Sequence, residues 1–122
     1  MILEQQTKSQ EKKWYDRIAK YAEAHGEFPK QEFEQYDMHH VFGRTFKHNK
    51  VAIGGWCVIP VAKRFHDVHS NNPWNVTHFK KRYEIEFGKQ IDQFIAMCMV
   101  IKDEDGELPF GDSVIHALVD LK

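Results

Sequence analysis

Histidines are the residues of this chain whose types and spacing could do chemistry. The adjacent His39 and His40 are followed by His66 and His69, and no acidic residue lies between Met38 and His66. A neutral imidazole can bind a borderline divalent cation, whereas an imidazole held off the cation can take a proton from water near neutral pH. All charged residues in this stretch are basic. We therefore expect a divalent metal site beside a phosphate-binding surface.

The elements that must position these histidines follow from the apolar pattern and the turn residues. We predict a strand, a loop, a second strand or hairpin arm, and a short helix, over residues 33–42, 43–50, 51–60 and 61–69. Neighbouring residues of a strand point to opposite faces. His39 and His40 are therefore not expected to do the same job.

Helices are predicted on both sides of this unit. An amphipathic helix over 12–25 ends at Gly26, and one of its faces carries Trp14, Ile18, Tyr21, Ala22 and His25. A second helix runs from Asn75 to Gly88. An almost wholly apolar segment, 91–101, predicts a central helix, 103–106 a turn, and Asp112 or Ser113 can cap a terminal helix. The fold class is therefore α+β, with about four helices around the strand, loop, strand and short helix.

Length and composition restrict the class of protein. The 122 residues suit one compact domain, and no apolar run approaches the roughly 20 residues of a membrane span. The first residues do not resemble a secretory signal, so we expect a cytoplasmic protein without a membrane partner. Cys57 and Cys98 lack metal-binding or redox spacing and are expected to be buried thiols.

Two short motifs resemble a known family. Asp37-Met38-His39-His40 resembles the Glu-Leu-His-His of the colicin DNases, and Lys63-Arg64-Phe65-His66-Asp67-Val68-His69 resembles their Lys-Arg-His-Ile-Asp-Ile-His. Residues 36–70 are similar to the ββα-metal finger of HNH (His-Me finger) nucleases, including small phage proteins. The resemblance implies one domain, 1–122, in which a finger over 36–70 is embedded in a helical surround over 10–26 and 75–122.

The family roles imply a metal centre with one divalent ion: Mg²⁺, Mn²⁺, Ni²⁺ or Zn²⁺. His39 and His66 would bind the ion and His40 would be the general base. The family's third ligand stands four residues after the second, where this chain has Ser70. His69 shares a helical face with His66 and is the expected third ligand.

Several positions at this centre stay open. His78 or Asn71 could replace His69 as the third ligand, and Arg64 is counted with His40 as catalytic. Nine residues before His66, where the family has an asparagine that orients the base, this chain has Cys57.

The function that the resemblance implies is hydrolysis of DNA phosphodiester bonds by an endonuclease, with branched or single-stranded DNA among the candidate substrates. Basic residues near the finger are the expected nucleic-acid contacts: Arg44, Lys47, Lys50, Lys63, Lys80, Lys81 and Arg82. The alternative is a catalytically weak or inactive module that binds nucleic acid or a host protein, in which the metal is structural.

Overall fold

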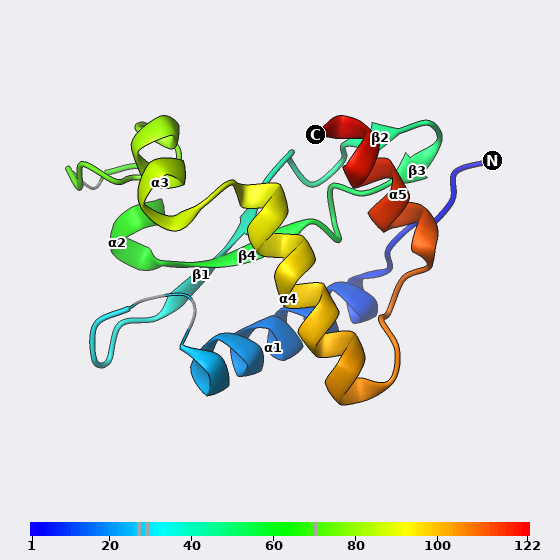
Figure 1. Cartoon of the computed structure of the whole chain (residues 1–122), viewed down its shortest axis with the longest axis horizontal. Helices are drawn as coiled ribbons and strands as arrows, with labels where there is room; N and C mark the ends of the chain where they lie inside the picture. Colours follow the sequence, from blue (N-terminus) through cyan, green and yellow to red (C-terminus); the bar gives the residue numbers. More distant parts are fainter. Residues whose placement is uncertain (27, 29, 70) are drawn as a thin grey trace.

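Two antiparallel strands cross the middle of the molecule, and a short helix follows the second of them (Figure 1). In this computed structural model, which describes residues 1–26, 28, 30–69 and 71–122, β1 (Tyr36–His40) pairs with β4 (Val58–Ala62). His39 lies opposite Ile59, and His40 lies opposite Val58. The helix α2 (Lys63–His66) begins directly after β4. This order agrees with the predicted strand, loop, strand and short helix.

A second antiparallel pair lies within the long connection between β1 and β4. It joins β2 (Lys47–His48) to β3 (Val51–Ala52), and Leu3 forms a parallel bridge with Val51. The described residues therefore form two small sheets and, with α2, five helices, which is an α+β fold.

The first helix, α1, extends over Lys8–His25 and thus begins four residues before the predicted start. Thr7 caps it: its hydroxyl accepts from the Gln10 N–H, and the Gln10 side chain accepts from the Thr7 N–H. Gly26 ends it with φ 64°, in the left-handed region. Four residues of the predicted face, Trp14, Ile18, Tyr21 and Ala22, are buried, whereas His25 at the end of the helix is exposed.

The predicted helix over 61–69 is wrong at both ends. Val61 and Ala62 are buried and belong to β4, where they pair with Asp37 and Tyr36. At the other end, Asp67 is extended, with φ −61° and ψ 122°. Four residues of helix remain, because Val61 and Ala62 stabilise the fold more as buried strand residues than as the start of a helix. Ser70 lies outside the described residues. So does Pro29, which is expected to prevent continuation of the first helix.

The helix predicted from Asn75 to Gly88 begins later, as α3 (Lys80–Phe87). Asn75 is buried, and its side-chain oxygen accepts from the N–H groups of Thr77 and His78. This side chain therefore stabilises a turn before the helix instead of capping the helix itself.

The last two helices are α4 (Gln90–Asp105) and α5 (Asp112–Leu121). The turn predicted at 103–106 is instead the last turn of α4, which ends at Gly106 with φ 83°. Gly111 occupies the cap position of α5, and no side chain caps that helix, so the expected capping by Asp112 or Ser113 is wrong.

The core lies where α1, α4, α5 and the β1–β4 pair meet, and it holds both thiols, Cys57 and Cys98. Two tryptophans connect its parts. The indole of Trp14 donates to the Trp56 carbonyl (2.9 Å), and the indole of Trp56 donates to the Glu4 carbonyl (2.7 Å). Among the described residues, no helix combines the length and apolar character needed to cross a bilayer.

Candidate functional site

His39 and His66 lie side by side although 26 residues separate them in the chain. Their ring centres are 5.2 Å apart, with an angle of 68° between the ring planes. The pairing of β1 with β4 causes this approach, because α2 continues β4 and returns His66 to β1. Both side chains are half-buried.

Each of these imidazoles has one ring nitrogen bound by another side chain. His39 Nε2–H donates to Gln90 Oε1 (2.9 Å), and His66 Nδ1–H donates to Asp37 Oδ2 (3.1 Å). Metal-binding histidines usually donate their second N–H to such an acceptor, which fixes tautomer and ring orientation. With the amide oriented in this way, the free lone pairs are on Nδ1 of His39 and Nε2 of His66.

Gln90 is the residue at this site that the sequence did not indicate. It is the first residue of α4, far outside the segment that resembles the nucleases, and it is 3% exposed. A buried glutamine needs a hydrogen-bond partner, and His39 provides one. A polar residue at the start of an otherwise apolar helix was the only signal available.

The site keeps His39 in the form that binds metal. Burial, followed by the charge of the neighbouring His66, lowers the pKa of His39 to about 4. At neutral pH its imidazole is therefore uncharged. A metal ion needs this form because a protonated nitrogen has no lone pair to donate.

His40 is held on a different side of β1, by the helix α1. The Tyr15 hydroxyl and His40 Nε2 form a hydrogen bond (2.9 Å), and the two rings meet edge to face. Burial raises the pKa of Tyr15, so the phenol stays protonated at neutral pH. Burial, then the nearby Arg44, lowers the pKa of His40. Both shifts favour a neutral imidazole beside a neutral phenol.

The three candidates for a third ligand are exposed and lie beyond the end of α2. The His69 N–H donates to Asp67 Oδ1 (2.9 Å), and His78 Nε2–H donates to the Val68 carbonyl (2.9 Å). In residues 1–26, 28, 30–69 and 71–122, no group of three or more His, Cys, Asp or Glu side chains is placed to hold a metal ion. His69, His78 and Asn71 thus stay predictions.

The donor set fits a divalent metal in part. With metal–nitrogen bonds of about 2.0–2.1 Å, two imidazoles on one tetrahedral ion have ring centres about 5 Å apart. The observed separation of His39 and His66 agrees with this value. Their acceptors Gln90 and Asp37 also fit. Two imidazoles alone leave ligand positions for water or a phosphate oxygen.

Cys57 occupies the position at which the nuclease family has an asparagine, and it does not replace that residue. Its side chain is fully buried, and burial raises the pKa of its thiol to about 12. Its backbone carbonyl accepts from the Val41 N–H (3.1 Å), directly after the histidine pair. The contact of His40 with Tyr15 is the observed restraint on the imidazole.

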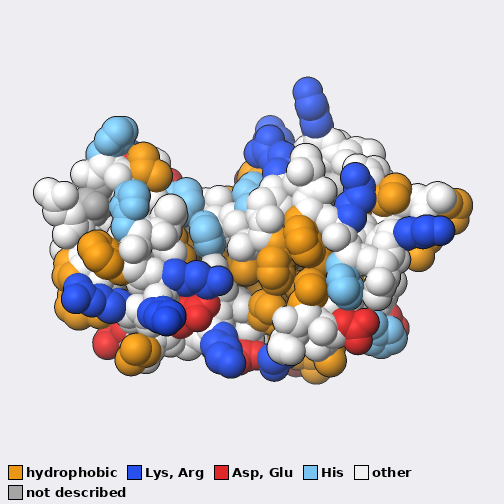
Figure 2. All heavy atoms as spheres, turned by 90° about the horizontal axis from the view of Figure 1, so that it is seen from above, with side chains coloured by type: hydrophobic (Ala, Val, Ile, Leu, Met, Phe, Trp, Pro, Cys, Tyr) orange, Lys and Arg blue, Asp and Glu red, His pale blue; other side chains and the backbone are white. Residues whose placement is uncertain are grey.

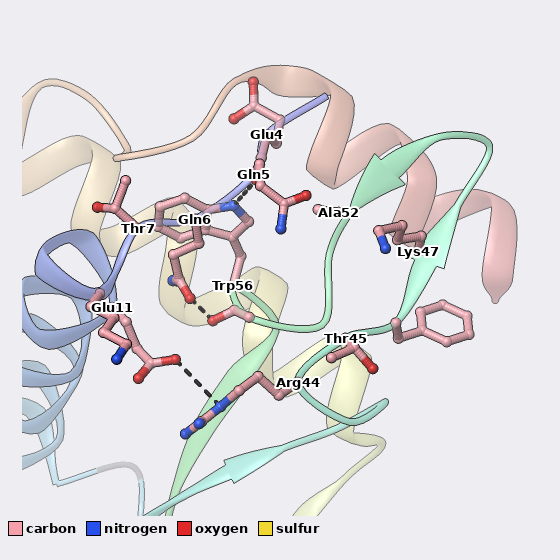
Figure 3. Close-up of a pocket in the computed structure, with 13 residues that line it drawn as sticks. Glu4, Gln5, Gln6, Thr7, Glu11, Arg44, Thr45, Lys47, Ala52 and Trp56 are labelled. Carbon is pink, nitrogen blue, oxygen red and sulfur yellow. Dashed lines mark hydrogen bonds and ion pairs between the residues drawn. The ribbon is translucent and has the colours of Figure 1, made fainter. Parts of the chain in front are cut away.

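Two of the three arginines expected to contact DNA or to act in catalysis, Arg44 and Arg64, are bound to carboxylates. Arg44 lies 3.4 Å from Glu11 and borders a cavity of about 410 Å³ between the N-terminal segment, α1 and the loop before β2 (Figure 3). Arg64 pairs with Glu34. This cavity also has Glu4 in its wall, so its charge is mixed.

All the lysines expected to contact nucleic acid are exposed, and so is Arg82. Lys80, Lys81 and Arg82 lie on α3. Lys47 and Lys50 lie on the β2–β3 hairpin, and Lys63 begins α2. Figure 2 shows histidine side chains gathered over the end of the molecule that carries α2 and α3, with Lys and Arg side chains beside them. The imidazoles and part of the basic surface therefore share one face.

No protein-family model, curated protein or solved structure matches this chain. The likeness to HNH nucleases therefore rests on the two motifs within residues 36–70.

Proposed function

We propose that this protein is a metal-dependent endonuclease that hydrolyses DNA phosphodiester bonds, with His39 and His66 as metal ligands. The observation that carries the proposal is the approach of these two imidazoles to 5.2 Å at the end of an antiparallel strand pair and its following helix. A structural core histidine would not require a matched second imidazole with its own acceptor.

The outer hydrogen bonds support this proposal. Asp37 and Gln90 accept from one nitrogen of each ring and leave the other nitrogen with a lone pair. The carboxylate of Asp37 also fixes the tautomer and ring orientation of His66. A bound divalent ion would supply electrostatic stabilisation of the charge that develops on the phosphate.

His40 is the proposed general base. Its lowered pKa keeps it neutral and able to accept a proton at neutral pH. The Tyr15 hydroxyl occupies Nε2, so water that gives its proton to this nitrogen has to take the place of the hydroxyl. Two exposed lysines, Lys63 at the start of α2 and Lys80 at the start of α3, would attract the DNA backbone.

A nicking assay tests the proposal. Supercoiled plasmid is incubated with the protein and Mg²⁺, Mn²⁺, Ni²⁺ or Zn²⁺, and wild type is compared with His39→Ala, His40→Ala and His66→Ala. The exposed His116 on α5 gives the matched control, His116→Ala. We expect His40→Ala to lower the rate about 10²- to 10⁴-fold and His116→Ala to leave it unchanged. Intact plasmid with wild type and every metal would refute the nuclease.

A second function, a nucleic-acid- or protein-binding module with a structural metal, is favoured by different observations. Arg44 and Arg64 are bound to Glu11 and Glu34, and Nε2 of His40 is hydrogen-bonded to the Tyr15 hydroxyl. A scaffold needs neither a free arginine nor a free base.

Metal-dependent unfolding separates the two functions. A structural metal raises the midpoint of thermal unfolding strongly, and chelation lowers it, without plasmid cleavage. The nuclease proposal instead expects nicking that His40→Ala abolishes while metal-dependent stabilisation persists, because His40 is not a ligand. Stabilisation by metal without nicking would therefore favour the module.

A further inference from the structure

A second cavity, of about 200 Å³, lies between the loop after β1 and the ends of three helices. Its apolar wall comes from four half-buried side chains: Val41, Phe42, Ile91 and Leu121. Phe42 stacks on Phe46, with ring centres 5.0 Å apart and planes 21° from parallel, which holds its ring in place. The cavity therefore offers a fixed aromatic ring among aliphatic side chains.

The cavity adjoins the histidine pair. Gln90 is part of its wall, and the Gln90 side-chain oxygen accepts from His39 Nε2–H. Lys80 is also part of the wall. The pKa of His39 is lowered by burial, by the charge of His66 and, with smaller effects, by other charges that include Lys80. Lys80 therefore lies near that imidazole. The cavity therefore lies beside the histidine pair, with Gln90 and Lys80 common to both.

The charges around the cavity leave a positive balance. Its wall includes Lys80, Lys89 and Lys122 as well as Glu84 and Asp92. Asp92 pairs with Lys122 (2.6 Å). In the part of the chain that the structure describes, Lys80 and Lys89 form no ion pair, and both are exposed. Two cations thus stand at the edge of an apolar cavity, against one carboxylate.

We propose that this cavity binds one unstacked nucleobase of the substrate strand, next to the phosphate at the histidine pair; the inference rests on the nuclease function proposed above. An apolar wall with an aromatic ring suits the face of any base, and the lysines suit the flanking phosphates. The volume is below the roughly 300–1,000 Å³ of a typical ligand pocket, so it suits one ring system and not a whole nucleotide.

This occupant determines the form of the substrate. A base inside a duplex is paired and stacked, and extracting it costs free energy that a single strand does not have to supply. The protein should therefore bind a single strand, or a frayed or branched end, more tightly than a blunt duplex. An acidic peptide with an apolar side chain would fit similar charges, but it would not share the phosphate site.

The test measures binding without cleavage. Fluorescence anisotropy in EDTA at low salt follows a labelled DNA strand of about 12 nucleotides, the same strand in which abasic residues replace every base, and the blunt duplex. We expect the intact single strand to bind about ten-fold more tightly than the abasic strand, and more tightly than the duplex. Equal affinity for intact and abasic strands would overturn the inference, and so would no measurable binding of the intact strand.

Two variants place the effect in the cavity. Phe42→Leu should weaken binding of the intact strand about ten-fold and leave the abasic strand unchanged, whereas Phe33→Leu, at a ring that is 93% exposed, should change neither. If Phe42→Leu fails to fold, Lys89→Gln, at an exposed residue, serves instead. It should weaken binding of both the intact and the abasic strand. Lys102→Gln, at the far end of α4, should weaken binding of neither. Equal effects of Lys89→Gln and Lys102→Gln would contradict the inference.

The outcome is independent of the nicking assay. Nicking without discrimination between intact and abasic strands would overturn the base site alone. Base-dependent binding that Phe42→Leu removes, without nicking under any metal, would overturn the nuclease and retain a single-strand binding site.

Discussion

The hydroxyl of Tyr15, on α1, lies 2.9 Å from Nε2 of His40, at the end of β1. The two residues are 25 positions apart, and the contact ties the first helix to the residue proposed as the general base. Neighbouring His39 makes its hydrogen bond to α4 instead. Two adjacent histidines are thus held by two different helices.

Removing the Tyr15 hydroxyl should free His40 at a modest cost in stability. Tyr15→Phe deletes one half-buried hydrogen bond, so we expect the free energy of unfolding to fall by about 1 kcal/mol in urea denaturation. Because water then reaches Nε2 without competition, nicking by Tyr15→Phe should be faster than nicking by wild type. The double variant Tyr15→Phe with His40→Ala should be as slow as His40→Ala. A Tyr15→Phe variant that nicks more slowly would show that the hydroxyl assists the base.

Gln90 should control metal affinity without being a ligand. Gln90→Met keeps a long side chain but removes the acceptor for His39 Nε2–H, and we expect about a 10- to 100-fold weaker binding of Zn²⁺ or Ni²⁺ in calorimetry. Gln90→Glu keeps an acceptor and should retain most of the affinity.

Gln93 offers the matched control for this experiment, because it lies one turn further along α4 and donates to the Phe87 carbonyl. Gln93→Met should bind metal as wild type does. Unchanged metal affinity in Gln90→Met would remove Gln90 from the metal centre.

The pair of Glu34 and Arg64 should make the free energy of unfolding depend on pH in the acidic range. Burial alone raises the pKa of Glu34, but hydrogen bonds from the N–H groups of Gln31 and Arg64, together with the Arg64 charge, hold it below its ordinary value. A carboxyl with a lowered pKa in the folded state contributes stability that is full above the unfolded pKa of about 4.3. That contribution is lost as the pH falls through the folded pKa.

Chemical denaturation between pH 7 and pH 2 measures this contribution. Glu34→Gln should be less stable than wild type at pH 7, and the difference should shrink below about pH 4. Glu32→Gln, at an exposed neighbouring carboxylate, should leave the wild-type curve unchanged. A difference between Glu34→Gln and wild type that is constant with pH would contradict this assignment.

Gly54 should tolerate no side chain. A Cβ at this position would lie 2.0 Å from the Gly43 carbonyl oxygen and 2.6 Å from the Phe46 nitrogen, and both atoms belong to backbone. We expect Gly54→Ala to lower the free energy of unfolding by at least about 2 kcal/mol. At Gly111 the nearest atom is the flexible carboxylate of Glu4, so Gly111→Ala should cost less. Equal unfolding midpoints for the two variants would contradict the packing argument.

Much of the fold was predictable because local patterns agree with it. The spacing of Trp14, Ile18 and Tyr21 predicted the buried face of α1, and Gly26 predicted its end. The start of α3 was not predictable in this way. Asn75 has the chemistry of a helix cap, but it is buried together with Val76, and its side chain satisfies a turn instead.

The charge pattern along the chain predicted only part of the candidate surface. The stretch from Met38 to His66 is wholly basic, and this suggested free cations beside the histidines. Glu11 and Glu34, which lie outside that stretch, pair with Arg44 and Arg64. Distant acidic residues therefore neutralise part of a surface that looks basic in the sequence.

By itself, the sequence determined the types of group available for chemistry and the elements that carry them: an imidazole pair on a strand and another imidazole on a following helix. Only the tertiary structure decided which groups meet. Strand pairing set His39 against His66, packing of α4 brought the buried Gln90 to His39, and packing of α1 brought Tyr15 to His40. The physical reason is that periodicity reports which face of an element is buried, whereas contacts between elements depend on how those faces pack.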